Sequence, residues 1–243
     1  MNSGRTFLEV CNVSKSFGGL VAVNCLSFTV NEQEVLGIIG PNGSGKTTVL
    51  NLISGVFPVS DGSIRLQGTD LTDKSAHKIA RAGVARTFQL VRVLKGLSVI
   101  ENVTAGAVFG YRRRWGKSAE LHARQLLERV GLADKQHQPV SALTYIDQKR
   151  VELARALAGD PQVLLLDEWL AGLNPSELQT GIELIESLSK EGRTIILVEH
   201  VMDAIRTLCH RCIVVNSGQL IAEGTPAAVL AAPAVVAAYL GDD

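Results

Sequence analysis

The segment GPNGSGKT at residues 40–47 constrains the fold more than any other part of this sequence. It matches the pattern GxxxxGK[ST], follows the apolar run VLGII and precedes a helical stretch expected at residues 47–54. Glycines let the main chain curl so that its N–H groups face an anion, and the start of the helix adds a positive dipole end. The pattern therefore predicts a phosphate-binding loop, in which Lys46 meets the outer phosphates and the Thr47 hydroxyl suits Mg²⁺.

Short apolar runs alternate with helical patterns along the chain. Runs typical of strands buried on both faces occur at residues 35–39, 163–166 and 194–198. Helices are expected at residues 147–158, 176–189 and 201–208. Two opening strands, rich in β-branched and apolar residues, are expected at residues 8–13 and 26–30. Because buried strands that alternate with helices form parallel sheets, the sequence predicts an α/β fold.

The middle of the chain has a different pattern. Between about residues 92 and 138 there is no buried-strand run, and helical spacing occurs at residues 99–108 and 119–130. We expect one apolar stripe on the second of these helices, formed by Leu121, Leu126, Leu127 and Val130. The stretch is interpreted as a helical sub-lobe inserted into the sheet domain, with residues 110–116 as an exposed turn.

Charge and hydropathy exclude several classes of partner. The 24 acidic and 24 basic residues cancel, so there is no overall attraction to nucleic acid or anionic lipid, and no nucleic-acid partner is expected. The opening MNSGRTFLEV lacks the apolar run of a secretory signal. The longest nearly apolar stretch, residues 227–240, is too short to cross a bilayer and contains Pro233. These features predict a cytoplasmic protein.

The four cysteines are expected to be buried thiols and not disulfides. Cys11 and Cys25 lie in apolar, strand-like runs, so we expect them in the core. Cys209 and Cys212 form a CxxC pair beside His210, but no further ligands follow at matching spacing. This spacing favours ordinary packing over a zinc site.

A second group of chemically competent residues follows the strand pattern VLLL, where Asp167 and Glu168 stand side by side. At the carboxyl edge of a parallel sheet, the first acid is placed to hold Mg²⁺ and the second to orient an attacking water. The alternative is a pair of solvent-exposed acids near a helix start. We favour the metal and water roles.

His200 follows the strand pattern TIILV and Glu199. A histidine just past the end of a core strand can donate a hydrogen bond to charge that develops on a γ-phosphate. A structural histidine is the alternative. The recurrence of a phosphate loop, an acidic strand end and this histidine in one predicted sheet favours a functional role.

Together these segments resemble the nucleotide-binding subunits of ATP-binding-cassette (ABC) transporters over nearly the whole chain. The resemblance implies a P-loop NTPase fold with a parallel-sheet core, an antiparallel β subdomain and an inserted helical subdomain. It implies a single ABC ATPase domain over residues 1–243, whose helical subdomain, with the signature helix, covers residues 92–158. ATP and Mg²⁺ are the implied cofactors.

Further motifs carry this resemblance. Phe17 in KSFGG matches the aromatic position that stacks on adenine, with core packing as the alternative. Gln89 in RTFQ matches the glutamine that senses Mg²⁺ and the attacking water, and AGLN at residues 171–174 matches the loop that crosses to the opposite subunit. His200 matches the family's switch histidine.

The resemblance assigns a role to each of these positions. Catalytic roles fall on Glu168, His200 and Gln89. Contacts with Mg²⁺ fall on Thr47, Gln89 and Asp167. Nucleotide contacts fall on the aromatic position, the phosphate loop and the signature segment, namely Phe17, Gly40, Pro41, Asn42, Gly43, Ser44, Gly45, Lys46, Thr47, Thr48, Thr144, Tyr145 and Ile146.

Within the family, several strings resemble the ATPase subunit of branched-chain amino acid uptake systems, among them GGLVAVN, ARTFQLVRVLKGLSVIENV and LIAEGTPAAV. This resemblance implies import of a small polar solute, most readily branched-chain amino acids. It also implies separate membrane-spanning permease subunits and a second ABC ATPase subunit, identical or different. The chain would then lie on the inner face of the cell membrane.

The signature segment departs from the family pattern. In LTYIDQ at residues 143–148, Ile146 stands where the family has its last glycine and Asp147 where it usually has glutamine. In the family, this helix start meets the γ-phosphate held by the other subunit. A β-branched residue hinders close approach, and an acid offsets the helix dipole. We therefore expect a weaker composite site and poor ATP hydrolysis by a homodimer.

Two more features bear on this departure. Thr144 with Asp147 three residues later predicts an N-cap, so the helix is expected to form. Trp169 replaces the proline that usually follows the acidic pair, a change expected to affect Glu168. Two alternatives to a transport ATPase stay open at this point: a catalytically weakened regulatory subunit, and a soluble ABC ATPase outside transport.

Overall fold

The structure, a computed structural model, describes residues 5–240. The chain divides into two compact units. One unit comprises the chain up to Ala76 and again from Leu170 onward, and the other comprises His77–Trp169. The phosphate loop and His200 therefore belong to the first unit, whereas Gln89, Asp167 and Glu168 belong to the second.

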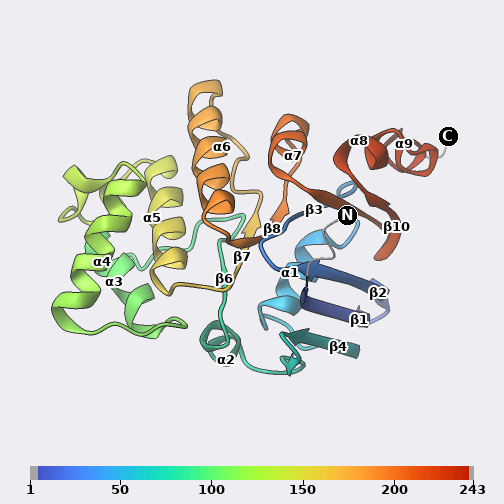
Figure 1. The fold of residues 1–243 in the computed structure, drawn as a ribbon, viewed down its shortest axis with the longest axis horizontal. Helices are drawn as coiled ribbons and strands as arrows, with labels where there is room; N and C mark the ends of the chain where they lie inside the picture. The colour runs from blue at the N-terminus through green and yellow to red at the C-terminus, as the bar shows by residue number, and fades with distance from the viewer. Residues whose placement is uncertain (1–4, 241–243) are drawn as a thin grey trace. The chain divides into compact units, whose positions relative to one another are not determined.

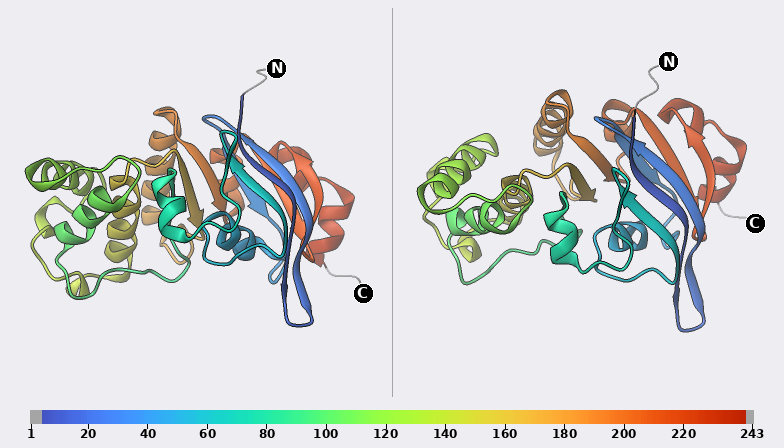
Figure 2. Two further views of the ribbon diagram at one scale, coloured as in Figure 1. Left: turned by 90° about the horizontal axis from the view of Figure 1, so that it is seen from below. Right: turned by 60° about the horizontal axis from the view of Figure 1, so that its bottom comes forward.

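An antiparallel sheet begins the first unit, with strand order β2, β1, β4, β5. Its strands are β1 (Thr6–Phe17), β2 (Leu20–Asn31), β4 (Asp61–Leu66) and β5 (Thr69–Asp70). β1 and β2 form the long blue hairpin of Figure 2. The strands predicted at residues 8–13 and 26–30 are present within these longer strands. This sheet is the expected antiparallel β subdomain.

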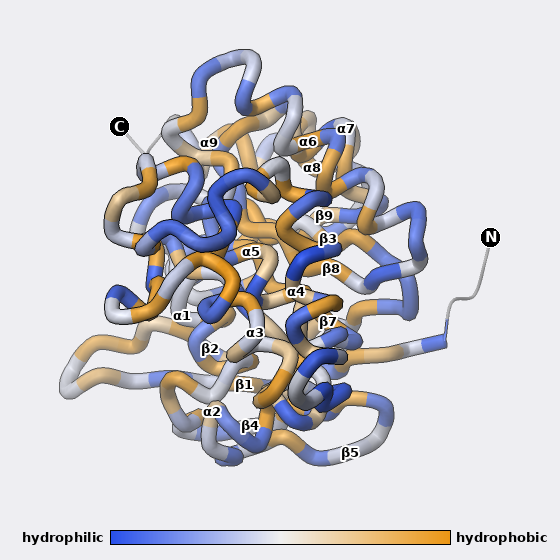
Figure 3. The backbone as a smooth tube through the Cα atoms, turned by 90° about the vertical axis from the view of Figure 1, so that its left-hand side faces the viewer, coloured by the Kyte–Doolittle hydropathy of each residue, from blue (hydrophilic) through white to orange (hydrophobic). Residues whose placement is uncertain are grey.

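The phosphate-loop motif follows a strand of a mainly parallel sheet. In this unit the strands run in the order β10, β9, β3, β8. β3 (Val35–Ile39) is parallel to β8 (Thr194–Val198) and to β9 (Arg211–Asn216), and β10 (Gln219–Gly224) is antiparallel to β9. Every residue of β3 and β8 is buried, which explains their unbroken apolar sequences. Their predicted bounds are confirmed, and Figure 3 shows hydrophobic colouring along these strands.

Helices complete the first unit. They are α1 (Lys46–Ile53), α6 (Pro175–Lys190), α7 (Met202–Leu208), α8 (Pro226–Leu230) and α9 (Pro233–Leu240). The three that were predicted, α1, α6 and α7, are present, and each end lies within one residue of the predicted one. α6 begins sharply because Asn174 accepts from the Glu177 N–H at 2.9 Å while Glu177 accepts from the Asn174 N–H at 3.0 Å.

The second unit pairs a short parallel sheet with a helical bundle. β6 (Val84–Arg86) lies parallel to β7 (Val163–Asp167), one residue longer than the predicted strand. The helices are α2 (Ala76–Arg81), α3 (Val99–Phe109), α4 (Gly116–Arg129) and α5 (Tyr145–Ala158), with 3₁₀ turns at Ala133–Lys135 and Val140–Ala142. α3, α4 and α5 pack side by side (Figure 1). They correspond to the helices predicted at residues 99–108, 119–130 and 147–158, although α4 begins at Gly116 and α5 at Tyr145, before the predicted starts.

The apolar stripe of α4 differs from the expected one. Leu121 is 60% exposed, so its assignment to the stripe was wrong. The buried residues of α4 are Ala119, Ala123, Leu126 and Leu127. Small alanines at helical spacing carry the N-terminal half of the stripe, and position 121 falls on the opposite side of the helix.

The cysteines divide into two kinds. Cys11 and Cys25 are exposed, so the expectation that they lie in the core was wrong. The pairing of β1 with β2 changes register between Val10 and Val13, and Cys25 has φ 47°, so the strict in-and-out alternation fails there. Cys209 and Cys212 are buried free thiols, as expected from ordinary packing. Their mutual hydrogen bond, together with burial, raises the pKa of Cys209.

Within residues 5–240, none of the helices combines the length and apolar character that crossing a membrane requires.

Candidate functional site

The phosphate loop turns sharply between β3 and α1. Gly40 has φ 150° and Gly45 has φ 105°, conformations that other residues rarely adopt. A Cβ added at Gly40 would lie 2.0 Å from the Val215 carbonyl oxygen, and one at Gly45 would lie 2.5 Å from the Ala22 carbonyl oxygen. Glycine is therefore required at both positions, since the main chain passes against its neighbours on the way into α1.

The Lys46 side chain lies inside this loop. Its ammonium donates hydrogen bonds to the carbonyl oxygens of Gly40 and Pro41, each at 2.8 Å, and the residue is buried. The charge is thus held where the loop curls, at the start of α1. Phosphate oxygens brought to this loop would compete with those carbonyls for the ammonium.

Ser44 supplies an independent sign that the loop fits an anion. Its hydroxyl is buried and has no hydrogen-bond partner among residues 5–240. Buried polar groups are nearly always hydrogen-bonded, so an unsatisfied hydroxyl in a curled loop suits a ligand oxygen. Of the other predicted loop contacts, Asn42 and Gly43 are exposed, whereas Pro41, Thr47 and Thr48 are half-buried.

Phe17 lies at the end of β1 with its ring 40% exposed. The ring makes an edge contact with Phe57 at a centroid distance of 5.2 Å, and the Lys15 ammonium lies 5.2 Å from its centroid. The ring is therefore fixed on one side by packing while part of it faces solvent. That placement is compatible with base stacking.

In the second unit, Asp167 ends β7 and is fully buried. Arg86, at the end of the neighbouring strand β6, donates a hydrogen bond from Nη2 to Asp167 Oδ2 at 2.6 Å. Burial lowers the pKa of Arg86, and the Asp167 charge opposes that decrease. Arg86 opens the RTFQ motif, but no local sequence pattern assigns it a role, because its pairing with Asp167 depends on the alignment of two strands.

Glu168 follows β7 with φ 49°, a left-handed conformation that turns the chain away from the strand. Gln89 donates a hydrogen bond from Nε2 to Glu168 Oε2 at 2.7 Å. Gln89 and Glu168 are 79 positions apart in the sequence, yet the fold brings them into direct contact. Both were expected to act on the same water. A carboxylate can accept several hydrogen bonds, so this contact is compatible with a further one from water.

Glu152, which no sequence motif singled out, supports Gln89 from helix α5. Its carboxylate accepts hydrogen bonds from the main-chain N–H groups of Phe88, at 3.2 Å, and Arg92, at 2.8 Å. Burial raises the pKa of Glu152, and these hydrogen bonds oppose the rise. The loop that carries Gln89 is therefore tied to α5 on both sides of the glutamine.

The signature segment forms the start of α5. Thr144 is the N-cap, accepting from the Asp147 N–H at 3.3 Å, so the predicted cap is confirmed. The Tyr145 side chain is 54% exposed, and its hydroxyl donates to the Gln89 carbonyl oxygen at 3.3 Å. Ile146 is half-buried in the first turn.

Asp147 does not present an uncompensated charge at the start of α5. It is 4% exposed, and its carboxylate pairs with Lys135 at 2.6 Å and with Arg150 at 3.4 Å. The hydrogen bond and charge of Asp147 raise the pKa of Lys135. The expectation that Asp147 cancels the helix dipole was therefore wrong, because two cations of the same unit offset its charge.

In the first unit, the end of β8 carries Glu199 and His200. Glu199 is buried and accepts a hydrogen bond from the Leu170 N–H at 2.6 Å. His200 is exposed immediately afterwards. The buried acid thus anchors the main chain that leads into the AGLN loop, while the histidine faces solvent.

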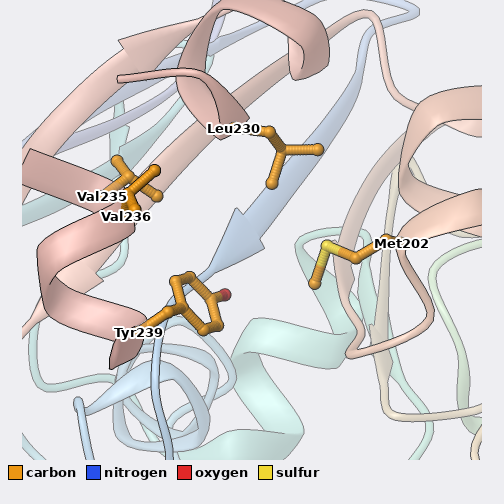
Figure 4. A pocket seen from close by; sticks show the side chains of 5 residues that line it. All are labelled: Met202, Leu230, Val235, Val236 and Tyr239. Atoms are coloured by element: carbon orange, nitrogen blue, oxygen red, sulfur yellow. The ribbon is translucent and has the colours of Figure 1, made fainter. Parts of the chain in front are cut away.

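An apolar pocket of about 260 Å³ lies near the phosphate loop in the same unit. Its lining residues are Met202, Leu230, Val235, Val236 and Tyr239 (Figure 4). Burial raises the pKa of the Tyr239 hydroxyl, and a hydrogen bond with the Gly40 main chain opposes that rise. Apart from the Tyr239 hydroxyl the lining is apolar, so the pocket suits an apolar group better than a triphosphate.

Comparison with known proteins settles the family. The family model described as "ABC transporter" matches residues 23–171, more than half of the chain. The chain belongs to the ABC transporter family. A second model, for the branched-chain amino acid ATP-binding cassette transporter, matches residues 219–243. The resemblance inferred from the sequence is confirmed.

Curated relatives within the ABC family match along nearly their whole length. The high-affinity branched-chain amino acid transport ATP-binding protein BraF of Pseudomonas aeruginosa is 38% identical, with 98% of this chain and 99% of BraF covered. LivG of Escherichia coli (strain K12), which carries the same description, is 39% identical with the same coverage. The chain is thus an ATP-binding subunit of the ABC type, an ATPase.

Solved ABC cassettes have the same fold. The ADP conformation of MJ1267, an ATP-binding cassette of an ABC transporter, has a TM-score of 0.87 and 30% identity, and the match covers 98% of this chain and all of MJ1267. A nucleotide-free ATP-binding cassette from an ABC transporter has a TM-score of 0.88 at the same identity and coverage. These similarities confirm the predicted P-loop α/β fold.

Proposed function

We propose that this ABC ATPase energises the import of branched-chain amino acids, together with separate membrane-spanning permease subunits and a second ABC ATPase subunit. The contact between Gln89 and Glu168 carries the proposal for the chemistry, since it places a carboxylate next to the glutamine expected to sense the attacking water. The names and near-complete coverage of BraF and LivG support the solute. In this arrangement the chain lies on the inner face of the membrane.

The residues of the phosphate loop have a defined task in this proposal. Lys46 exchanges its hydrogen bonds with the Gly40 and Pro41 carbonyls for phosphate oxygens, and the Ser44 hydroxyl gains its missing partner. Phe17 stacks on the base. Each contact orients the triphosphate without covalent chemistry, as phosphoryl transfer requires.

Asp167, Thr47 and Gln89 are proposed to hold Mg²⁺. Their donors are a carboxylate, a hydroxyl and an amide, the oxygen ligands that a hard cation prefers. When bound, Mg²⁺ offsets the negative charge that builds up on phosphate oxygens. Arg86 keeps the buried Asp167 charge balanced.

Glu168 is proposed to accept a proton from the attacking water, and His200 to donate a hydrogen bond to the γ-phosphate. Gln89 orients the Glu168 carboxylate by its hydrogen bond to Oε2, and the carboxylate can accept a further hydrogen bond from water. Gln89 and His200 are both exposed. Exclusion of bulk water then falls to the second ATPase subunit.

We further propose that the chain forms a single ABC ATPase domain in which residues 92–158 are the helical subdomain that docks on the permease. This segment contains α3, α4 and α5 and lies outside the phosphate loop. The exposed apolar side chains of Phe109 and Leu121 are available for that contact.

A transport assay tests the proposal. The chain is reconstituted with its permease in vesicles, and uptake of labelled leucine, isoleucine and valine is measured with and without ATP. We expect uptake that depends on ATP and is lost in the Lys46→Ala variant. ATP-driven uptake of other solutes only would contradict the assigned solute. ATP hydrolysis is measured in the same vesicles, and a rate that the permease does not increase would contradict the assigned partner.

A further inference from the structure

A reciprocal pair of hydrogen bonds joins helix α5 to the end of β7 within the second unit. The Trp169 indole donates from Nε1 to the Lys149 carbonyl oxygen at 3.2 Å. In return, the Lys149 ammonium donates to the Trp169 carbonyl oxygen at 3.0 Å and reaches the Glu168 carbonyl oxygen at 3.5 Å. Each residue is therefore both donor and acceptor for the other, although 20 positions separate them.

Both partners are deeply buried, each 2% exposed. Buried lysines are rare because the charge must leave water. A lysine that is buried therefore needs partners that stabilise its charge. Here the ammonium meets main-chain carbonyls and also lies 5.4 Å from the centroid of the Tyr145 ring. Replacing the indole or the ammonium would remove a hydrogen bond from a buried main-chain carbonyl of the partner.

The pair holds the main chain on the C-terminal side of Glu168. Glu168 has a positive φ, a conformation that costs free energy in a residue other than glycine and persists only where neighbours enforce it. Its carbonyl oxygen is within reach of Lys149, and the next residue is fixed by the indole. The direction in which the Glu168 side chain leaves the strand is therefore set from α5.

The same network closes through the signature segment. The Tyr145 hydroxyl donates to the Gln89 carbonyl oxygen, and the Gln89 amide donates to the Glu168 carboxylate. Tyr145 and Lys149 are one helical turn apart on α5. A shift of the first turn of α5 therefore reaches Glu168 by two routes, through its carboxylate and through its main chain.

We propose that Lys149 and Trp169 are positioning residues that fix the Glu168 carboxylate against Gln89 and couple its orientation to the first turn of α5. This inference rests on the proposed role of Glu168 in activating water. Neither residue touches the nucleotide or the reacting atoms. Their effect is on the rate of hydrolysis, not on nucleotide affinity.

The first test compares Trp169→Phe and Lys149→Met with the control Trp115→Phe, whose tryptophan is 63% exposed. Loss of one buried hydrogen bond that holds a catalytic group predicts a fall in kcat of about five- to tenfold, with KM for ATP unchanged. The control is expected to match the wild type. Circular dichroism and thermal melting identify any variant that is unfolded, and only folded variants are compared.

Trp169 also offers a readout besides activity. In the Trp115→Phe background it is the sole tryptophan of the chain. We expect its emission to change when ATP is added to a Glu168→Gln form that binds without hydrolysis, because α5 and Glu168 are linked through the indole. Adding Lys149→Met should abolish that change while calorimetry still detects nucleotide binding.

The Glu168→Gln variant distinguishes the proposed role of Glu168 in activating water from the positioning role of Lys149 and Trp169. If it is inactive while Trp169→Phe and Lys149→Met hydrolyse ATP like the Trp115→Phe control, the positioning role is overturned and the proposed function stands. If Glu168→Gln hydrolyses ATP like the wild type, the proposed role of Glu168 fails and the positioning role fails with it. An emission response that survives Lys149→Met would also contradict the coupling.

Discussion

Arg86 and Asp167 form a buried ion pair 2.6 Å long, with side chains 4% and 1% exposed. The two residues end neighbouring parallel strands, β6 and β7, so their pairing is fixed by the sheet. Asp167 is the carboxylate proposed to hold Mg²⁺, and its charge is already balanced by a guanidinium of the same unit. Any cation that binds there shares the carboxylate with Arg86.

Arg86→Met is expected to destabilise the fold strongly, because it leaves the Asp167 carboxylate buried without its counter-charge. Breaking a buried pair costs about 3–5 kcal/mol, measured as the free energy of unfolding in urea. Lys190→Met is the matched control, since it removes an exposed pair of similar length, Lys190 with Glu186 at 2.9 Å. Its cost is expected to stay below about 1 kcal/mol. Equal losses in the two variants would contradict a special role for burial at Asp167.

Lys135→Met tests whether the Asp147 charge is offset at the start of α5. Because the pKa of Lys135 is raised by its partner, the ion pair is fully formed below the ordinary lysine pKa of 10.5 and is lost as pH rises through the higher folded value. The variant should therefore be less stable than the wild type by a constant amount between pH 7 and about 9. Thermal melts across that range measure it, and a difference that is absent at pH 7 would count against the pair.

Glu152→Gln tests the support of the loop that carries Gln89. Gln has one acceptor oxygen, so one of the Phe88 and Arg92 N–H groups loses its partner, and ATP hydrolysis should fall. Burial raises the pKa of Glu152. The contribution of this group to the free energy of unfolding is therefore fully present below the ordinary glutamate pKa of 4.5 and is lost as pH rises through the folded value. The stability of Glu152→Gln relative to the wild type should therefore increase with pH, as urea unfolding between pH 5 and 8 would reveal. If the stability of Glu152→Gln relative to the wild type decreased with pH, the result would contradict a raised pKa of Glu152.

Ile146→Gly tests the hypothesis that the signature departure slows hydrolysis by a homodimer. Glycine allows close approach at the first turn of α5, so the isolated protein should hydrolyse ATP faster. The helix should also lose up to about 1 kcal/mol of stability. Phosphate release from the two proteins and from the assembled complex gives the comparison, and identical rates for the wild type and Ile146→Gly would refute the hypothesis.

The strands that place the phosphate loop could be predicted from the sequence because local patterns determine them. The apolar runs at β3 and β8 are bounded by polar residues or glycine, and both strands are buried throughout. The N-cap at Thr144 is equally local. The acidic pair and Gln89 were singled out by motif, and the structure brings Gln89 and Glu168 together.

What the sequence did not reveal depends on tertiary contacts. Arg86 and Glu152 act through partners 81 and 60 or more positions away, which no local pattern encodes. Lys135 reverses the interpretation of Asp147 because a 3₁₀ turn brings it to the start of α5. Cys11 and Cys25 were misassigned because register shifts in β1 and β2 interrupt the alternation on which such assignments depend.

Calorimetry and phosphate release on the same preparations test most directly whether Lys46 holds the nucleotide and Glu168 activates water. With Mg²⁺ and ATP, the wild type should bind and hydrolyse, Glu168→Gln should bind with little hydrolysis, and Lys46→Ala should bind weakly or not at all. Glu177→Gln, a half-buried acid that caps α6, is the control for loss of a carboxylate. Hydrolysis by Glu168→Gln at the wild-type rate, or unchanged binding by Lys46→Ala, would contradict the account.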